Sequence, residues 1–125
     1  MSVNFNTTLE PIVVGKAADY TIALSSTGGA LAIADIQNVV VTFKADPNDA
    51  DADKILQKVL GAGISITGVS GGIVSALMQL TNADTALFTA GKIYYFDVQV
   101  DTTSRGPELT AAGRVPIRQP ITISN

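Results

Sequence analysis

The segment Ile93–Val100, IYYFDVQV, constrains the fold more than any other part of the sequence, because two kinds of side chain alternate along it. Successive side chains of a β-strand point to opposite faces of its sheet. One face would carry Tyr94, Phe96, Val98 and Val100, and the other Ile93, Tyr95, Asp97 and Gln99. We therefore predict a strand with one face in a core and with Tyr95, Asp97 and Gln99 facing a partner or solvent.

The residues before this strand predict a short helical turn from Thr81 to Phe88. The Thr81 hydroxyl can accept a hydrogen bond from an exposed backbone N–H, and the Asp84 carboxylate faces the positive end of the turn. Glycine tolerates the left-handed conformation that closes a helix, so Gly91 marks the end of the helical region.

Other segments share the strand-like pattern, with β-branched residues between glycine-rich turns. They are Val3–Val14, Tyr20–Ser25, Ile36–Ala45, Ile64–Thr67, Ile73–Leu80 and Leu109–Asn125, with a loop at Thr102–Pro107. Pro11 and Pro116 lack a backbone N–H, which predicts that their strands lie at sheet edges. The pattern predicts an all-β fold, a single antiparallel immunoglobulin-like β-sandwich of about seven to nine strands over residues 1–125.

The segment Lys54–Leu60, KILQKVL, fits two periods. Ile55, Leu56 and Val59 match the stripe of a helix, whereas alternate residues match one face of a strand. Aspartates before the segment could cap a helix and Gly61 could end it. The β-rich surroundings favour a strand, and a helix remains the alternative.

The composition excludes several function classes. The chain contains no Cys, His or Trp, so thiolate or imidazole catalysis and metal sites built from these ligands are excluded. A net charge of −3 and a pI near 4.6 argue against nucleic acid as a partner. The N-terminus lacks a signal-peptide pattern, and no apolar run is long enough to span a membrane. We expect no enzyme, cofactor, small-molecule substrate or membrane partner.

The chain is also poor in charge. Charged residues make up 15% of it and the mean hydropathy is +0.32, whereas about 25% of residues are charged in a typical domain. A soluble monomer normally keeps a mixed, charged surface. We therefore expect part of this surface to be covered by other subunits.

An acidic loop stands out at Asp46–Asp53, with carboxylates at Asp46, Asp49, Asp51 and Asp53. Alternating carboxylates can ligate Ca²⁺. An EF-hand counted from Asp49, however, would place Lys54 at its glycine position and Leu60 at its bidentate acid. A solvated acidic loop is therefore favoured over a calcium site, and its aspartates are candidates for contacts with a partner.

The arginines of the chain, Arg105, Arg114 and Arg118, all lie near its C-terminal end. Ordinary solvated charge is the favoured interpretation, since exposed charges are common and individually weak. The alternative is that these arginines contact acidic surface on a neighbour, such as the same loop of another copy.

Two further patterns resemble sites. Gly68–Gly72, GVSGG, matches the Gly-x-Ser-x-Gly expression around a catalytic serine, but Ser70 would have no histidine base in this chain. A hairpin turn is the better explanation. Sugar stacking would need an exposed tyrosine, and Tyr20 and Tyr95 are the candidates, whereas Tyr94 is expected to be core with its hydroxyl bonded locally.

The C-terminal half resembles small immunoglobulin-like modules of tailed-bacteriophage virion proteins, such as the N-terminal domain of siphophage upper baseplate proteins. The matching residues are Gly72, Thr81, Asp84, Thr85, Gly91, Tyr94, Tyr95, Asp97, Gly113, Val115 and Ile117. They build the fold, so the resemblance says more about architecture than about position in the virion.

The resemblance implies a non-enzymatic structural subunit, present in several copies as a head decoration, head–tail or baseplate- and tail-associated protein. Its partners would be other virion proteins and copies of itself, and its location the virion after synthesis in the host bacterial cytoplasm. A host-surface glycan-binding or adhesion module is the alternative, using Tyr20 or Tyr95.

Overall fold

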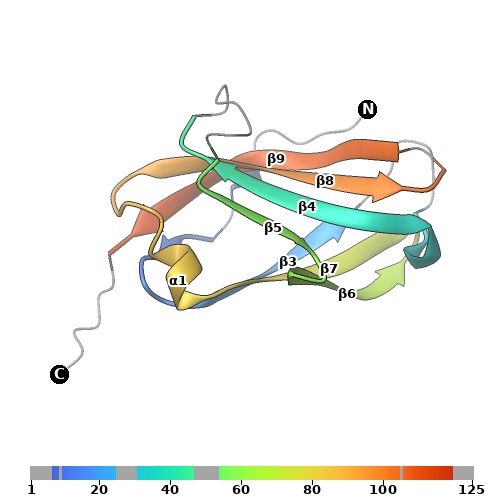
Figure 1. Ribbon diagram of the computed structural model, residues 1–125, viewed down its shortest axis with the longest axis horizontal. Coiled ribbons are helices and arrows are strands. Elements are labelled where there is room, and N and C mark those ends of the chain that lie inside the picture. The colour runs from blue at the N-terminus through green and yellow to red at the C-terminus, as the bar shows by residue number, and fades with distance from the viewer. Residues whose placement is uncertain (1–6, 9, 25–30, 47–53, 105, 120–125) are drawn as a thin grey trace.

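The protein is mostly β-structure in the computed structural model, which describes residues 7–8, 10–24, 31–46, 54–104 and 106–119 (Figure 1). The strands are β1 Thr7–Thr8, β2 Ile12–Val13, β3 Ala18–Leu24, β4 Ile36–Lys44, β5 Leu56–Leu60, β6 Gly63–Ser70, β7 Ile73–Leu80, β8 Ile93–Thr102 and β9 Gly106–Arg118. Two short helical segments interrupt them, η1 at Ile33–Asp35 and α1 at Asn82–Thr85. The all-β prediction is confirmed, and so is the helical turn after Thr81.

The described strands form one nine-stranded sheet in the order β1-β9-β8-β4-β5-β6-β7-β3, with β2 also paired to β9. The sheet folds over, so that β9, β8 and β4 form one layer and β6, β7 and β3 form the other (Figure 1). The long pairings are antiparallel. The short pairings of β1 and β2 with β9, and of β5 with β6, are parallel, which the sequence did not predict.

The space between the layers holds the core, which is built by alternation along the strands. On β8, Tyr94, Phe96, Val98 and Val100 are buried, as predicted. Phe88, just after α1, joins them from the end of the sheet. Its ring makes edge-to-face contacts with Phe43, at 5.5 Å between ring centres, and with Tyr94, at 4.9 Å. Such contacts stabilise aromatic pairs beyond the area that they bury.

Tyr20 lies in this core, so the prediction that it could be an exposed sugar platform is wrong. Only 8% of the residue is exposed, and its hydroxyl donates to the Glu10 carbonyl at 2.8 Å. This bond links β3, one end of the strand order, to the segment that leads into β2 beside β9. Burial, together with the nearby Glu10 charge, raises the pKa of Tyr20 to about 12.

Pro116 does not mark a sheet edge, because β9 has partners on both sides. Ile117 donates its N–H toward β8, to the Lys92 carbonyl at 2.9 Å. The nitrogen of Pro116 therefore faces the other side, where Arg114 is the last residue paired with β1 and Ile117 the first paired with β2. Pro116 thus occupies the gap between two short strands, where no N–H is needed.

The ambiguous segment Lys54–Leu60 is a strand over its last five residues, β5, as favoured. It pairs antiparallel with β4 and passes through Gly61, at φ 88°, into β6. Two expected boundaries differ. The predicted strand Val3–Val14 contributes only β1 and β2 within the described residues, and the predicted loop Thr102–Pro107 is shorter, because β8 extends to Thr102 and β9 starts at Gly106.

Candidate partner-binding face

The outer face of β4, β8 and β9 carries a cross-strand row with Tyr95 at its centre. Tyr95 is in register with Lys44 on β4 and with Arg114 on β9. Directly opposed side chains on neighbouring strands have Cβ atoms about 4.5–5.5 Å apart. The half-buried Tyr95 ring is therefore flanked by two cationic side chains, and Arg114 is exposed. Such a row suits an acidic or planar group on a partner.

Asp97 and Gln99 continue this face along β8, as the alternation predicted. Asp97 is half-buried and in register with Thr42 and Ala112, which are themselves buried. Gln57 of β5 donates from Nε2 to the Thr42 hydroxyl at 3.0 Å, so the polar surface continues across β5. Gln99 is exposed and lies where a bulge shifts the register between β8 and β9.

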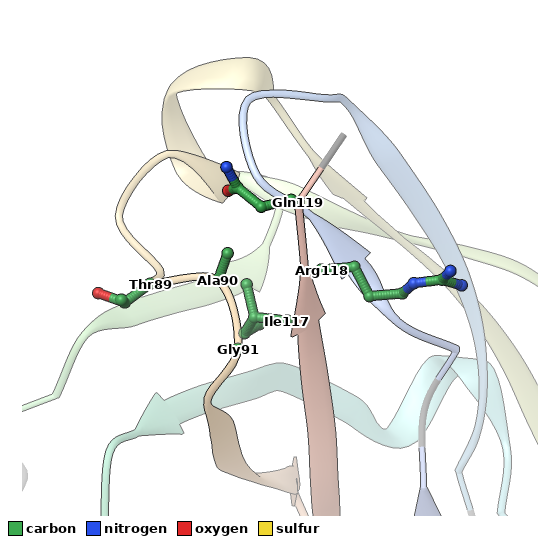
Figure 2. Close-up of a pocket in the computed structure, with 6 residues that line it drawn as sticks. All are labelled: Thr89, Ala90, Gly91, Ile117, Arg118 and Gln119. Atoms are coloured by element: carbon green, nitrogen blue, oxygen red, sulfur yellow. The ribbon is translucent and has the colours of Figure 1, made fainter. Parts of the chain in front are cut away.

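Arg118 lies at the far end of β9, four positions from Arg114, beside an open depression of about 600 Å³. The depression lies between the loop before β8 and the end of β9, and it is lined by Thr89, Ala90, Gly91, Ile117, Arg118 and Gln119. Figure 2 shows the Ile117 side chain pointing toward Ala90 and Gly91, while Arg118 points away from them. Gly91 donates its N–H to the Ile117 carbonyl at 2.9 Å, which fixes the two walls together.

The acidic loop is represented only by Asp46, which is exposed just beyond β4. Asp49, Asp51 and Asp53 lie outside the described residues, as does Arg105. Their predicted contacts with a partner, and the choice between a solvated loop and a calcium site, stay predictions. The structure therefore brings together Tyr95, Asp97, Gln99 and Arg114 on one face, with Arg118 at its end.

Asp84 is a structural residue, not part of this face. It forms the predicted capping box: Thr81 donates its N–H to Asp84 Oδ2 at 2.8 Å, and the Thr81 hydroxyl accepts from Asp84 N–H at 3.2 Å. Lys58 of β5 adds an ion pair, with Nζ 2.5 Å from the same Oδ2. Burial alone would raise the pKa of Asp84, but the bonds from Lys58 and Thr81 outweigh it and lower that pKa. Because Lys54–Leu60 fits both a helix and a strand, the sequence did not indicate this role of Lys58.

Ser70 sits at a hairpin turn and not at a strand-to-helix elbow. Gly71 and Gly72 follow it with φ of 60° and 79°, and Ser70 pairs with Ile73 across the turn. Two consecutive positive φ values are typical of a type I′ turn, which glycine favours because it has no side chain. The glycine spacing that resembled a nucleophile motif is therefore explained by the turn.

Within the described residues, no group of three or more acidic, His or Cys side chains is placed to hold a metal ion. Every buried side-chain nitrogen or oxygen in that part of the chain has a hydrogen-bond partner. A search of the described helices finds none with the length and apolar character needed to cross a membrane.

No protein-family model matches the chain, and comparison with curated proteins gives no match.

Proposed function

We propose that the chain is an immunoglobulin-like β-sandwich that serves as a non-enzymatic structural subunit of a tailed-bacteriophage virion, present in several copies. The strand order supports the fold. Immunoglobulin constant-type domains place strands B, E and D in one sheet and C, F and G in the other. Here β3, β7 and β6 are neighbours in that order, as are β4, β8 and β9.

Tyr94 supports the same assignment. Immunoglobulin-like domains often carry a tyrosine near the start of strand F whose hydroxyl bonds to backbone a few residues upstream. Tyr94 is the second residue of β8, the strand in the F position, and its hydroxyl accepts from the Thr89 N–H at 3.0 Å. One difference is that β5 and β6 join the two layers into a continuous sheet.

The observation that carries the function is the row Lys44–Tyr95–Arg114 on the outer face of β4, β8 and β9. A mostly polar face on paired strands, with an aromatic side chain between cations, is suited to holding another protein through an aromatic anchor and charged contacts. The row Lys44–Tyr95–Arg114 does not combine a nucleophile with a neighbouring general base. Together with the phage-like residue pattern and a charge-poor composition, it supports a role in docking other virion proteins, and many equal copies would add avidity.

Membership of a virion can be tested on particles. A bacterial strain that carries this sequence would be induced to release phage, the particles purified on a density gradient, and their proteins identified by mass spectrometry. We expect the chain to co-purify at many copies per particle. Its absence from particles whose capsid and tail proteins are detected would contradict the proposal.

The contact face can be tested by incorporation into the same particles. Replacing Tyr95 with Ala, or Arg114 with Glu, should reduce the copies bound at least tenfold, because both change the centre of the proposed contact. Thr21→Glu, on the exposed side of β3 in the other layer, is the matched control and should bind normally. Normal incorporation of both face variants would exclude this face.

Glycan binding remains the second candidate, because Tyr95 is partly exposed beside Lys44 and Arg114. Tyr20 and Tyr94 are buried, so a sugar site on this face would depend on Tyr95. A glycan array would separate the two functions. Binding that Tyr95→Ala abolishes would favour the adhesion module over the structural subunit.

A further inference from the structure

Two arginines and three less polar side chains adjoin one another on the outer face of β8 and β9. Along β9, Arg114, Pro116 and Arg118 are alternate residues and therefore face the same side. In register, Tyr95 lies opposite Arg114, and Ile93 lies opposite Pro116. Directly opposed side chains have Cβ atoms about 4.5–5.5 Å apart, so these residues form one continuous surface. We name Ile93, Tyr95, Arg114, Pro116 and Arg118 the arginine row.

The middle of the arginine row is apolar and accessible. Ile93 is 55% exposed, more than any other large apolar side chain in the described part of the chain, and Pro116 opposite it is half-buried. Covering these two side chains with an apolar group would remove them from water, which is favourable. A partner that binds over this point therefore needs an apolar side chain there.

The two ends of the row on β9 are cationic. Arg114 and Arg118 are both exposed, and among the described residues neither forms an ion pair. Figure 2 shows Arg118 extending away from the walls of the depression. Four residues along a strand span about 13 Å, so the two arginines lie at that spacing on either side of Pro116. A partner can neutralise both only with two separate acidic groups.

Further cations surround the arginine row. They are Lys44 opposite Tyr95 on β4, Lys92 next to Ile93, and Lys16 in the turn that follows the bond from the Val14 N–H to the Arg118 carbonyl. These lysines enlarge the positive region around the two arginines, because like charges add to the potential that a partner meets.

Three acids lie near the row as well. Asp97 on β8 and Asp46 beyond β4 each take part in an interaction of their own, and Glu10 is exposed between β1 and β2, beside β9. Asp19 is exposed on the outer side of β3, in the other layer, and so faces away (Figure 1). Among the described residues near the row, cations still outnumber acids, although the chain has a net charge of −3. The row is therefore complementary to an acidic partner.

We infer that the arginine row binds an extended acidic segment of a partner protein, with one carboxylate at each arginine and an apolar side chain between them against Ile93 and Pro116. Alternate side chains of an extended segment lie on one side, about 6.6 Å apart, so an acidic, an apolar and a second acidic residue at alternate positions match the row. An acidic pair one helical turn apart spans only about 5–6 Å and fits less well. Arginine can hold a carboxylate through two parallel hydrogen bonds. The inference rests on the proposed function, for which it names the chemistry of the partner.

An NMR titration of the 15N-labelled chain tests this binding directly. The probe is a short peptide with the central sequence Asp-Ser-Leu-Ser-Asp, added up to about 5 mM, because a single contact of this kind should bind with a Kd on the order of 1 mM. We expect the amide signals of Ile93, Tyr95 and Arg114 to shift. A peptide with Asn in place of both Asp residues should bind at least about fivefold more weakly. A peptide with Ser in place of Leu should bind at least about twofold more weakly.

Variants of the chain show whether the arginines hold the carboxylates. Arg114→Gln and Arg118→Gln should each weaken binding at least about threefold, and the loss should be smaller at high salt. Thr21→Glu changes the net charge by the same amount in the other layer, and it should bind as the wild type does. Glu10→Gln should tighten binding, because it removes a like charge beside the row and keeps the backbone carbonyl that Tyr20 bonds. The spectrum of each variant also shows that it is folded.

Equal binding of the acidic and the Asn peptides would overturn the inference, and so would arginine variants that bind as the wild type does. Equal binding of the Leu and the Ser peptides would overturn it too, since the row would then be a simple anion site. These results would leave virion membership to the particle experiment. Absence of the chain from purified particles would contradict the proposed function even if the peptide binds, so the two failures are distinguishable.

Discussion

Lys58 and Asp84 connect parts of the sheet that are far apart in sequence, since β6 and β7 lie between them in the chain. The Lys58 Nζ lies 2.5 Å from Asp84 Oδ2, and the two side chains are 14% and 16% exposed. The lysine stem reaches α1 by passing over Gly63. The strand that joins the two layers is thereby tied to the cap of the helix at the end of the core.

Replacing Asp84 with Asn should lower the free energy of unfolding by about 1–3 kcal/mol, because it removes the ion pair and weakens the capping box around a mostly buried lysine. Urea denaturation would measure the change. Asp19→Asn, at an exposed position of β3, is the control and should stay within about 0.5 kcal/mol of the wild type. Equal effects of the two substitutions would show that the ion pair contributes nothing.

The same carboxyl should make stability depend on acid pH. The pKa of Asp84 is lower in the folded chain than in the unfolded chain, so the folded state holds this proton less tightly. Its contribution is complete above the unfolded pKa, about 3.9, and is lost as pH falls through the lower folded pKa. Between about pH 5 and pH 2, unfolding free energy should fall more steeply in the wild type than in Asp84→Asn. Parallel curves would contradict this.

Tyr20 should make the stability of the fold depend on alkaline pH. Its folded pKa of about 12 lies above the ordinary tyrosine pKa of 10.0, so its contribution is complete below pH 10 and decreases as pH rises toward 12. Tyr20→Phe should remove this alkaline loss of stability. It should also cost about 1 kcal/mol at neutral pH, through the lost bond to the Glu10 carbonyl. Denaturation at several alkaline pH values tests the first effect, and an unchanged profile in the variant would refute it.

Three glycine positions allow backbone strain to be separated from steric overlap. At Gly63 a Cβ atom would lie 2.7 Å from the Lys58 Cδ, and φ is 106°. Gly61 has φ of 88° with open space around it, and Gly68 has open space and no positive φ.

In thermal or urea unfolding we expect Gly68→Ala to change stability by less than about 0.5 kcal/mol. Gly61→Ala should cost about 1–2 kcal/mol, because alanine is strained in a left-handed conformation. Gly63→Ala should cost more than Gly61→Ala, since Lys58 must also move. A Gly63→Ala chain as stable as the Gly68→Ala chain would mean that the lysine stem adapts without cost.

Local patterns predicted much of this fold. The alternation in Ile93–Val100 gave the buried and outer faces of β8, and the Thr81 and Asp84 spacing gave the capping box, because both depend on residues close in sequence. The burial of Tyr20 also follows a local pattern, because Tyr20, Ile22 and Leu24 alternate with exposed residues along β3. The partners on both sides of Pro116 depend instead on segments distant in sequence, and the residues around Pro116 do not indicate them.

The candidate face, too, was predicted only where it depends on residues close in sequence. The pattern placed Tyr95, Asp97 and Gln99 together on one side of a strand. That Arg114 lies beside Tyr95 could not be predicted, since it depends on the register between β8 and β9. The exposure of Val69, Ile73 and Leu87 was missed because they look like ordinary core residues in sequence. Their exposure follows from where the hairpin and the helical turn end.

The pairing of Thr7 with Gly113 affects how fast the protein can form. Strands from opposite ends of the sequence must meet before this part of the sheet exists, so closing that long loop costs chain entropy before any contact compensates for it. Folding of such β-topologies takes on the order of milliseconds to seconds. During synthesis β9 is the last of the described strands to emerge, so it completes the layer only after the other strands are available.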